Sequence, residues 1–247
     1  MPPVLLLYLA VGDYGAFVPQ QAIDPAVDAD SISVSVNEMP ANGGLGAPVG
    51  VTELDGSVYV TDAREHSIRR VGSVSSDTIA GGRPPGFSDG DGSDVRLFSP
   101  RGVAALGDAL LVADSANAAL RSVTRDGDVT TLFHSEGYAA AELRDAITAA
   151  GGDDPEPVST RAIDGLWSPQ GLASWSPTTA LVADTDNHRI LTFALGDNGW
   201  ALSHFAGSGQ IGFADGEAST ARFSYPRDVA VCPDRLGKDL DGLPISP

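Results

Sequence analysis

The feature that most constrains this chain is an internal repeat with a period of about 50 residues. Four prolines, Pro48, Pro100, Pro169 and Pro226, each stand just before a short apolar run. A period of this length is typical of repeat architectures, in which each unit buries its hydrophobic face against its neighbours. The interval between Pro100 and Pro169 is longer than the others and therefore predicts an insertion.

Each full unit contains the same series of strand-like runs. The apolar run after the proline is followed by a second run that ends in aspartate, in "VYVTD", "LLVAD" and "ALVAD", at Asp62, Asp114 and Asp184. A turn, a third run, a polar turn and a fourth run complete the unit. Short strands joined by short turns pair as antiparallel meanders, and repeated four-stranded meanders form the blades of a β-propeller. The sequence thus predicts an all-β propeller with about three full blades and partial ones.

The repeat also predicts how the chain is divided. One short helix is expected over residues 139–150, because this Ala-rich stretch places Leu143 and Ile147 four residues apart. The expected divisions are 1–42 (partial blade strands or an N-terminal extension), 43–82 (blade), 83–133 (blade), 134–160 (helix and loop insertion), 161–207 (blade) and 208–247 (crossover, start of the next blade and irregular tail).

Composition limits the classes of partner. The chain has 15 Lys and Arg against 33 Asp and Glu, a formal net charge of −18, so it should repel phosphate backbones and no nucleic-acid partner is expected. Cys232 is the only cysteine, which leaves no intramolecular disulfide and no thiolate metal cage. The apolar N-terminal run is too short for a membrane helix, which needs about 20 residues. We interpret residues 7–13 as a strand of a partial blade, with a secretory signal as the alternative; the compartment stays open.

The repeated residues have structural roles to fill first. Phe98 and Phe223 lie in the crossovers between blades, where each could pack between adjacent sheets. Each proline suits the entry of a strand, because it lacks an N–H. Each aspartate that ends a second strand could accept hydrogen bonds from the amides of the following turn.

These motifs resemble the NHL repeat family. The segment "VADTDNHRILTF" carries the Asn-His of the family's central turn as Asn187 and His188, and "GFADGEASTARFSYPRDVAV" follows it. The first unit keeps the histidine as His66 and the second keeps the asparagine as Asn117. The resemblance implies a propeller, usually of six blades, that acts as a docking surface for proteins or other macromolecules. It implies structural roles for Asp62, His66, Asp114, Asn117, Asp184, Asn187, His188, Phe98, Phe223, Pro100, Pro169 and Pro226.

The number of units leaves two ways to arrange the chain. The favoured one is an open part of a larger propeller, six-bladed as the resemblance implies, whose exposed blade edges could drive self-association. The alternative is a closed ring of four blades, in which a strand over residues 227–231 pairs with the N-terminal run near residues 7–11.

Strand parity places the second-to-third-strand turns and the crossovers on one face, which we call the motif face. Arg101, Gln170 and Arg227 each follow a repeat proline and are expected at the central mouth of that face, where arginines favour carboxylate or phosphate groups. The leading hypothesis is a non-catalytic scaffold that binds a protein or peptide, with no cofactor, metal or catalytic set. The alternative is a metal-dependent hydrolase or lyase with a divalent ion in the central channel, for which the inner strands offer Glu53 and Asp228. The run from Ser88 to Asp94 weakly resembles a calcium loop but coincides with the family's crossover turn.

Overall fold

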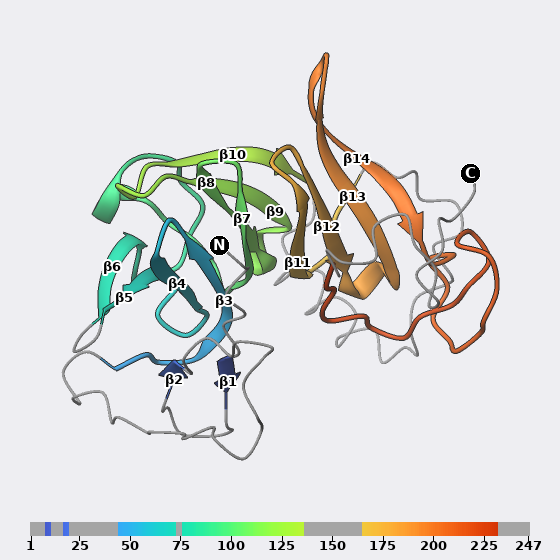
Figure 1. Ribbon diagram of the computed structural model, residues 1–247, viewed down its shortest axis with the longest axis horizontal. Helices are drawn as coiled ribbons and strands as arrows, with labels where there is room; N and C mark the ends of the chain where they lie inside the picture. The colour runs from blue at the N-terminus through green and yellow to red at the C-terminus, as the bar shows by residue number, and fades with distance from the viewer. Residues whose placement is uncertain (1–7, 11–16, 20–43, 73–75, 136–164, 232–247) are drawn as a thin grey trace, which may run out of the picture.

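Three four-stranded antiparallel sheets make up most of the described regular structure (Figure 1). The computed structural model describes residues 8–10, 17–19, 44–72, 76–135 and 165–231. We call the sheets blades 1 to 3 in chain order. Their strands are β3 (Pro48–Leu54), β4 (Ser57–Asp62), β5 (Ser67–Val71) and β6 (Ser76–Gly81); β7 (Pro100–Leu106), β8 (Ala109–Asp114), β9 (Ala119–Val123) and β10 (Val129–His134); and β11 (Pro169–Ser176), β12 (Thr179–Asp184), β13 (Arg189–Gly196) and β14 (Gly199–Ala206).

In each blade the four strands lie in chain order, so every connection within a blade is a turn between antiparallel neighbours. The inner strand β3 contacts β7, and β7 contacts β11, which sets the blades side by side in sequence (Figure 1). The only helical elements within the described ranges are short 3-10 turns, Gly92–Asp94, Ser115–Asn117 and Thr185–Asn187. The predicted all-β class with four-stranded propeller blades is therefore confirmed, and the sheets do not close into a ring. No helix of the described residues has the length and apolar character needed to cross a bilayer.

Each inner strand carries a bulge just after its proline. In blade 2, Pro100 pairs with Asp114 and the next regular pair is Val103 with Val112, so the inner strand holds one extra residue. The same shift occurs after Pro48 and after Pro169. A glycine lies inside every bulge, and a Cβ built on Gly102 would stand 2.0 Å from the carbonyl oxygen of Gln170 in the next blade. The bulge and its glycine therefore let neighbouring inner strands approach backbone to backbone.

Apolar clusters fill the junctions between blades, and one of the packing residues is not the one predicted from the sequence. Leu97 is fully buried between blades 1 and 2, Leu166 is buried between blades 2 and 3, and Phe223 packs on the outer side of blade 3. Gly86 donates to the Leu97 carbonyl, as Gly212 does to that of Phe223, so Leu97 is the counterpart of Phe223. Phe98, which the sequence placed between the sheets, is half-buried and packs edge-on against His66.

The start of a fourth blade differs from its prediction. Residues 226–231 form no strand in the structure, although they occupy the position of an inner strand: Thr185 donates to the Pro226 carbonyl, and Val229 and Val231 pack on Leu181, Ala183 and Ile190. Strand β1 (Tyr8–Ala10) pairs with β2 (Phe17–Pro19) and not with this segment. A strand needs a hydrogen-bonded neighbour, and within the described ranges this segment has none on its outer edge. The four-bladed ring is thus not formed.

Several expectations fall outside the described residues. They are the helix over 139–150, most of the insertion over 134–160, Cys232 and the tail from residue 232.

Candidate functional site

The aspartate that ends each second strand is the centre of a polar cluster on the motif face. Asp62, Asp114 and Asp184 are all completely buried. Asp114 accepts a hydrogen bond of 2.7 Å from the Phe98 amide, and Asp184 accepts one of 2.7 Å from the Trp167 amide. These donor amides precede the inner strand, whereas the sequence predicted donors in the turn after the aspartate. Asp62 accepts from both places: from Gly46 and Ala47 before the inner strand, and from Glu65 in the turn. Each carboxylate therefore ties a crossover to its own blade.

The motif asparagine strengthens this tie in two blades. Asn117 donates to Asp114 at 2.8 Å and Asn187 donates to Asp184 at 2.8 Å. The residue after each asparagine, Ala118 or His188, has a left-handed backbone with φ near 50°, which ends the 3-10 turn. The turn that resembles the family motif is thus held by its own side chains.

An arginine completes the cluster in blades 2 and 3, from different positions. Arg121 lies at the third residue of β9 and its Nη1 is 2.8 Å from Asp114, while Arg189 lies at the first residue of β13 and its Nε is 2.8 Å from Asp184. The register pairs Ala119 with Asp114, as it pairs Arg189 with Asp184. Arginines at two different strand positions thus pair with equivalent carboxylates. Neither arginine was predicted from the sequence. An arginine in the strand after each "VAD" run was the available signal.

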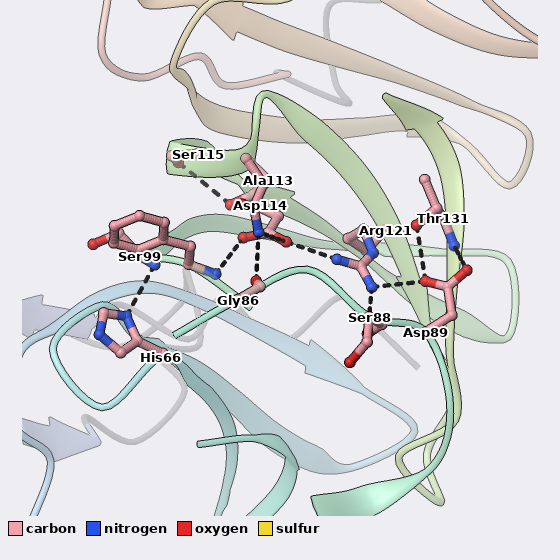
Figure 2. A network of polar contacts seen from close by, with 12 residues as sticks. His66, Gly86, Ser88, Asp89, Ser99, Ala113, Asp114, Ser115, Arg121 and Thr131 are labelled. Atoms are coloured by element: carbon pink, nitrogen blue, oxygen red, sulfur yellow. Dashed lines mark hydrogen bonds and ion pairs between the residues drawn. The ribbon is translucent and has the colours of Figure 1, made fainter. Parts of the chain in front are cut away.

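Arg121 extends the cluster of blade 2 to the crossover from blade 1. Figure 2 shows its guanidinium between Asp114 and Asp89. Nη2 donates to the Ser88 carbonyl at 2.9 Å and to Asp89 at 2.7 Å, and Asp89 also accepts from the amide and hydroxyl of Thr131. Phe87 covers the guanidinium carbon at 4.6 Å from its ring centroid. The Arg121 side chain is completely buried, and its charge is shared by two carboxylates.

Burial raises the pKa values of these aspartates, whereas hydrogen bonds to the carboxylates lower them. Burial raises the pKa of Asp114 to about 6, against the hydrogen bonds from Asn117, Phe98 and Arg121 that favour the carboxylate. Burial likewise raises the pKa of Asp184. Partial burial alone would raise the pKa of Asp89, but the hydrogen bonds from Thr131 and Arg121 together lower it.

The two motif histidines, in blades 1 and 3, each connect their blade to the crossover that follows it. His66 Nδ1 accepts a hydrogen bond of 3.1 Å from the Ser99 amide, and His188 Nδ1 accepts one of 3.2 Å from the Tyr225 amide. Ser99 and Tyr225 have positive φ angles and directly precede a repeat proline. Burial, with the nearby charge of Arg83, lowers the pKa of His66 and so favours the neutral ring that this acceptor role requires.

Hydroxyl groups provide further polar links between blades. Ser115 donates to the Pro169 carbonyl and Thr185 to the Pro226 carbonyl, and Thr61 donates to the Arg101 carbonyl. Each of these bonds fixes the start of one inner segment to the end of the second strand, or the turn after it, in the preceding blade.

The three residues expected at the mouth stand at this same end. Arg101 and Gln170 are half-buried and Arg227 is exposed. Because β7 contacts β11 and each residue follows a repeat proline, the three occupy equivalent positions along the inner strands. Their backbone carbonyls face the preceding blade, at Gly50, Gly102 and Gly171. No described residue makes a hydrogen bond or ion pair with their side chains.

The residues proposed for a divalent ion are held apart. Glu53 lies near the far end of β3 and accepts from the Gly56 amide, whereas Asp228 is two residues after its proline and accepts from the Val229 amide. In the possible calcium loop, the carboxylate of Asp89 is taken by Arg121 and Thr131. Among the described residues, no three His, Cys, Asp or Glu side chains gather as metal ligands would.

Comparison with known proteins gives distant likenesses only. No family model and no curated protein matches the chain. Among solved structures, virginiamycin B lyase from Staphylococcus aureus aligns at 15% identity and a TM-score of 0.43, over 72% of this chain and 46% of that one. An auxiliary nutrient binding protein from Bacteroides ovatus ATCC 8483 aligns at 13% identity and a TM-score of 0.49, over 86% of this chain and 50% of that one. The nidogen/laminin complex aligns at 16% identity and a TM-score of 0.44, over 76% of this chain and 69% of that one.

These neighbours are β-propeller-like proteins, and the chain spans about half the length of the two bacterial ones. Likenesses this distant show no function for this chain.

Proposed function

We propose that this chain is an NHL-type propeller segment that acts as a non-catalytic scaffold and binds a protein or peptide at the mouth of the motif face. The observation that carries the proposal is a contrast between arginines. Arg121 and Arg189 form buried ion pairs with aspartates of their own blades. Arg101 and Arg227, with Gln170 between them, keep their side chains free of any described partner while their backbones are fixed.

Charge suggests which partner the mouth would take. In a chain of net charge −18, two unpaired arginines in equivalent positions form a local site for an anionic group. A guanidinium matches a carboxylate through two parallel hydrogen bonds, and a glutamine between the arginines can add one more. The partner that we propose is therefore a peptide segment that presents a carboxylate, either an acidic side chain or a chain terminus.

Selection from a displayed library of random peptides would test this function. We expect the enriched peptides to carry Asp, Glu or a free carboxyl terminus, and to bind the double variant Arg101→Gln, Arg227→Gln at least about tenfold more weakly. Arg70→Gln is the matched control, because Arg70 is also an exposed arginine but lies on β5, away from the mouth. Peptides that bind the double variant as well as the parent, or no enrichment at all, would overturn the proposal.

A further inference from the structure

The chain contains two copies of one crossover motif, over residues 86–100 and 212–226. Both copies close with an antiparallel bridge, Ser88 with Arg96 and Ala214 with Arg222. Both carry the same first hydrogen bond, of 3.2 Å from Gly86 and 3.0 Å from Gly212 to the counterpart carbonyls. The two segments have the same length and the same local fold, so differences in what surrounds them are informative.

The first copy is fully engaged by the blade that follows it. Arg121 of β9 lies under the Phe87 ring and bonds Asp89, and Thr131 of β10 donates twice to Asp89. The His134 ring stacks on Phe87 with 4.5 Å between centroids. The backbone of Gly90 exchanges two hydrogen bonds with that of Val129. The motif thus receives the third and fourth strands of a blade.

The second copy presents the same groups, but no described strand covers them. Phe213, the counterpart of Phe87, is 94% exposed, against 44% for Phe87. Asp215, the counterpart of Asp89, makes no hydrogen bond or ion pair within the described part of the chain. The inner segment 226–231 that follows is docked on blade 3 through Thr185 and Val229, and its outer edge pairs with no strand of the described residues.

We propose that Phe213, Asp215 and the edge of residues 226–231 form a docking site for a three-stranded antiparallel β-meander. The first strand of this partner pairs with the edge at 226–231. Its middle strand carries an arginine that bonds Asp215 under the Phe213 ring, and its last strand carries a planar side chain that stacks on Phe213. Two observations select this occupant: the interface repeats the described junction between the first crossover and blade 2, and a carboxylate beside an exposed ring complements a guanidinium.

This site goes beyond the proposed function, because its recognition groups are an aromatic ring and a carboxylate rather than the arginines of the mouth. Its partner is a cationic β-structure, whereas the mouth is proposed to take an anionic segment. The two ideas therefore fail independently.

The chain itself supplies the probe. A synthetic peptide of residues 109–134, the β8–β10 meander, carries Arg121, Thr131 and His134 in the required order. We expect this peptide to bind the full chain in a fluorescence anisotropy titration. Phe213→Ala and Asp215→Asn should each weaken that binding at least about tenfold. Because both side chains are exposed, circular dichroism should show that both variants fold as the parent does.

A matched peptide separates the arginine pairing from general stickiness. The Arg121→Leu peptide should bind the parent chain weakly, and Asp215→Asn should weaken it no further, because the pair is already broken. Arg101→Gln, at the mouth, should leave binding of the parent peptide unchanged. Absence of binding, or equal binding to Phe213→Ala and to the parent chain, would overturn the proposal.

Discussion

At the scale of single residues, the buried aspartates explain why the motif repeats. Asp114 joins the Phe98 amide, the Asn117 amide group and the Arg121 guanidinium, so one carboxylate fixes a crossover, a turn and a strand. A buried ion pair adds little net stability when intact, because desolvation offsets attraction, but removal of one partner leaves an uncompensated charge. The motif residues thus specify local geometry, and their substitution should be felt as loss of stability.

The two arginine positions allow a test of this role. Arg121→Leu copies Leu191, which stands at the equivalent position of blade 3, and should lower the free energy of unfolding by about 3–5 kcal/mol. Adding Ala119→Arg copies the arrangement of Arg189 and should recover part of that loss, because the new guanidinium starts beside Asp114. Urea denaturation would measure both variants. If Arg121→Leu unfolds as the parent does, the pair does not hold the blade.

His66 predicts a pH dependence of stability. Its folded pKa is lowered, so its contribution is present above the unfolded value near 6.5 and is lost as pH falls through the folded pKa. The stability difference between the parent and His66→Ala should therefore grow from about pH 5 to about pH 7.5. Alanine is the natural residue at this position in blade 2, at Ala118. A difference that stays constant with pH would show that the neutral ring is not needed.

At the scale of elements, the repeat predicted the strands well because it reports hydrophobic periodicity and turns. The prolines, the "VAD" runs and the polar turns all bound the strands that the structure contains. Leu97 was missed because the aromatic Phe98 beside it looked like the counterpart of Phe223. Arg121 and Arg189 were missed because their spacing from the aspartate differs, and only the register shows that both reach it. The segment 226–231 has the pattern of a strand but lacks the partner that a strand needs.

The glycine in each inner-strand bulge should be hard to replace. Gly102→Ala would bring a Cβ to 2.0 Å from the Gln170 carbonyl oxygen, which is backbone and cannot rotate away. The free energy of unfolding should fall by about 1–3 kcal/mol. Gly196→Ala is the matched control, because its nearest neighbour is 3.9 Å from the new Cβ. Equal stability of the two variants in urea denaturation would contradict the close approach of the inner strands.

At the scale of the whole molecule, the outer side of blade 3 is a junction surface that no described blade covers. Trp175 and Phe205, about 40% and 39% exposed, pack edge to face there with 5.7 Å between centroids. The junctions of blades 1 and 2 and of blades 2 and 3 bury the corresponding surfaces. Exposed apolar surface of this kind favours association between copies.

Sedimentation velocity should detect that association. The sedimentation coefficient of the parent chain should rise with protein concentration, and Phe205→Ser should reduce the rise. Leu195→Ser serves as the control, because Leu195 is also an exposed apolar residue but lies at the tip of the β13–β14 hairpin. A monomer at every concentration, or an equal effect of both substitutions, would show that the outer side of blade 3 does not associate.

The central claim is that the described blades form an open series, in which residues 226–231 dock on blade 3 and pair with no strand of the described ranges. Hydrogen exchange followed by mass spectrometry measures this most directly, because backbone amides in a hydrogen-bonded ladder exchange far more slowly than unpaired ones. The open arrangement predicts fast exchange for Ala230 and Val231, with slow exchange for Ala104 and Leu111, which are paired in the centre of blade 2. Slow exchange at 227–231 together with 8–10 would contradict it, because both segments would then be paired in a closed ring.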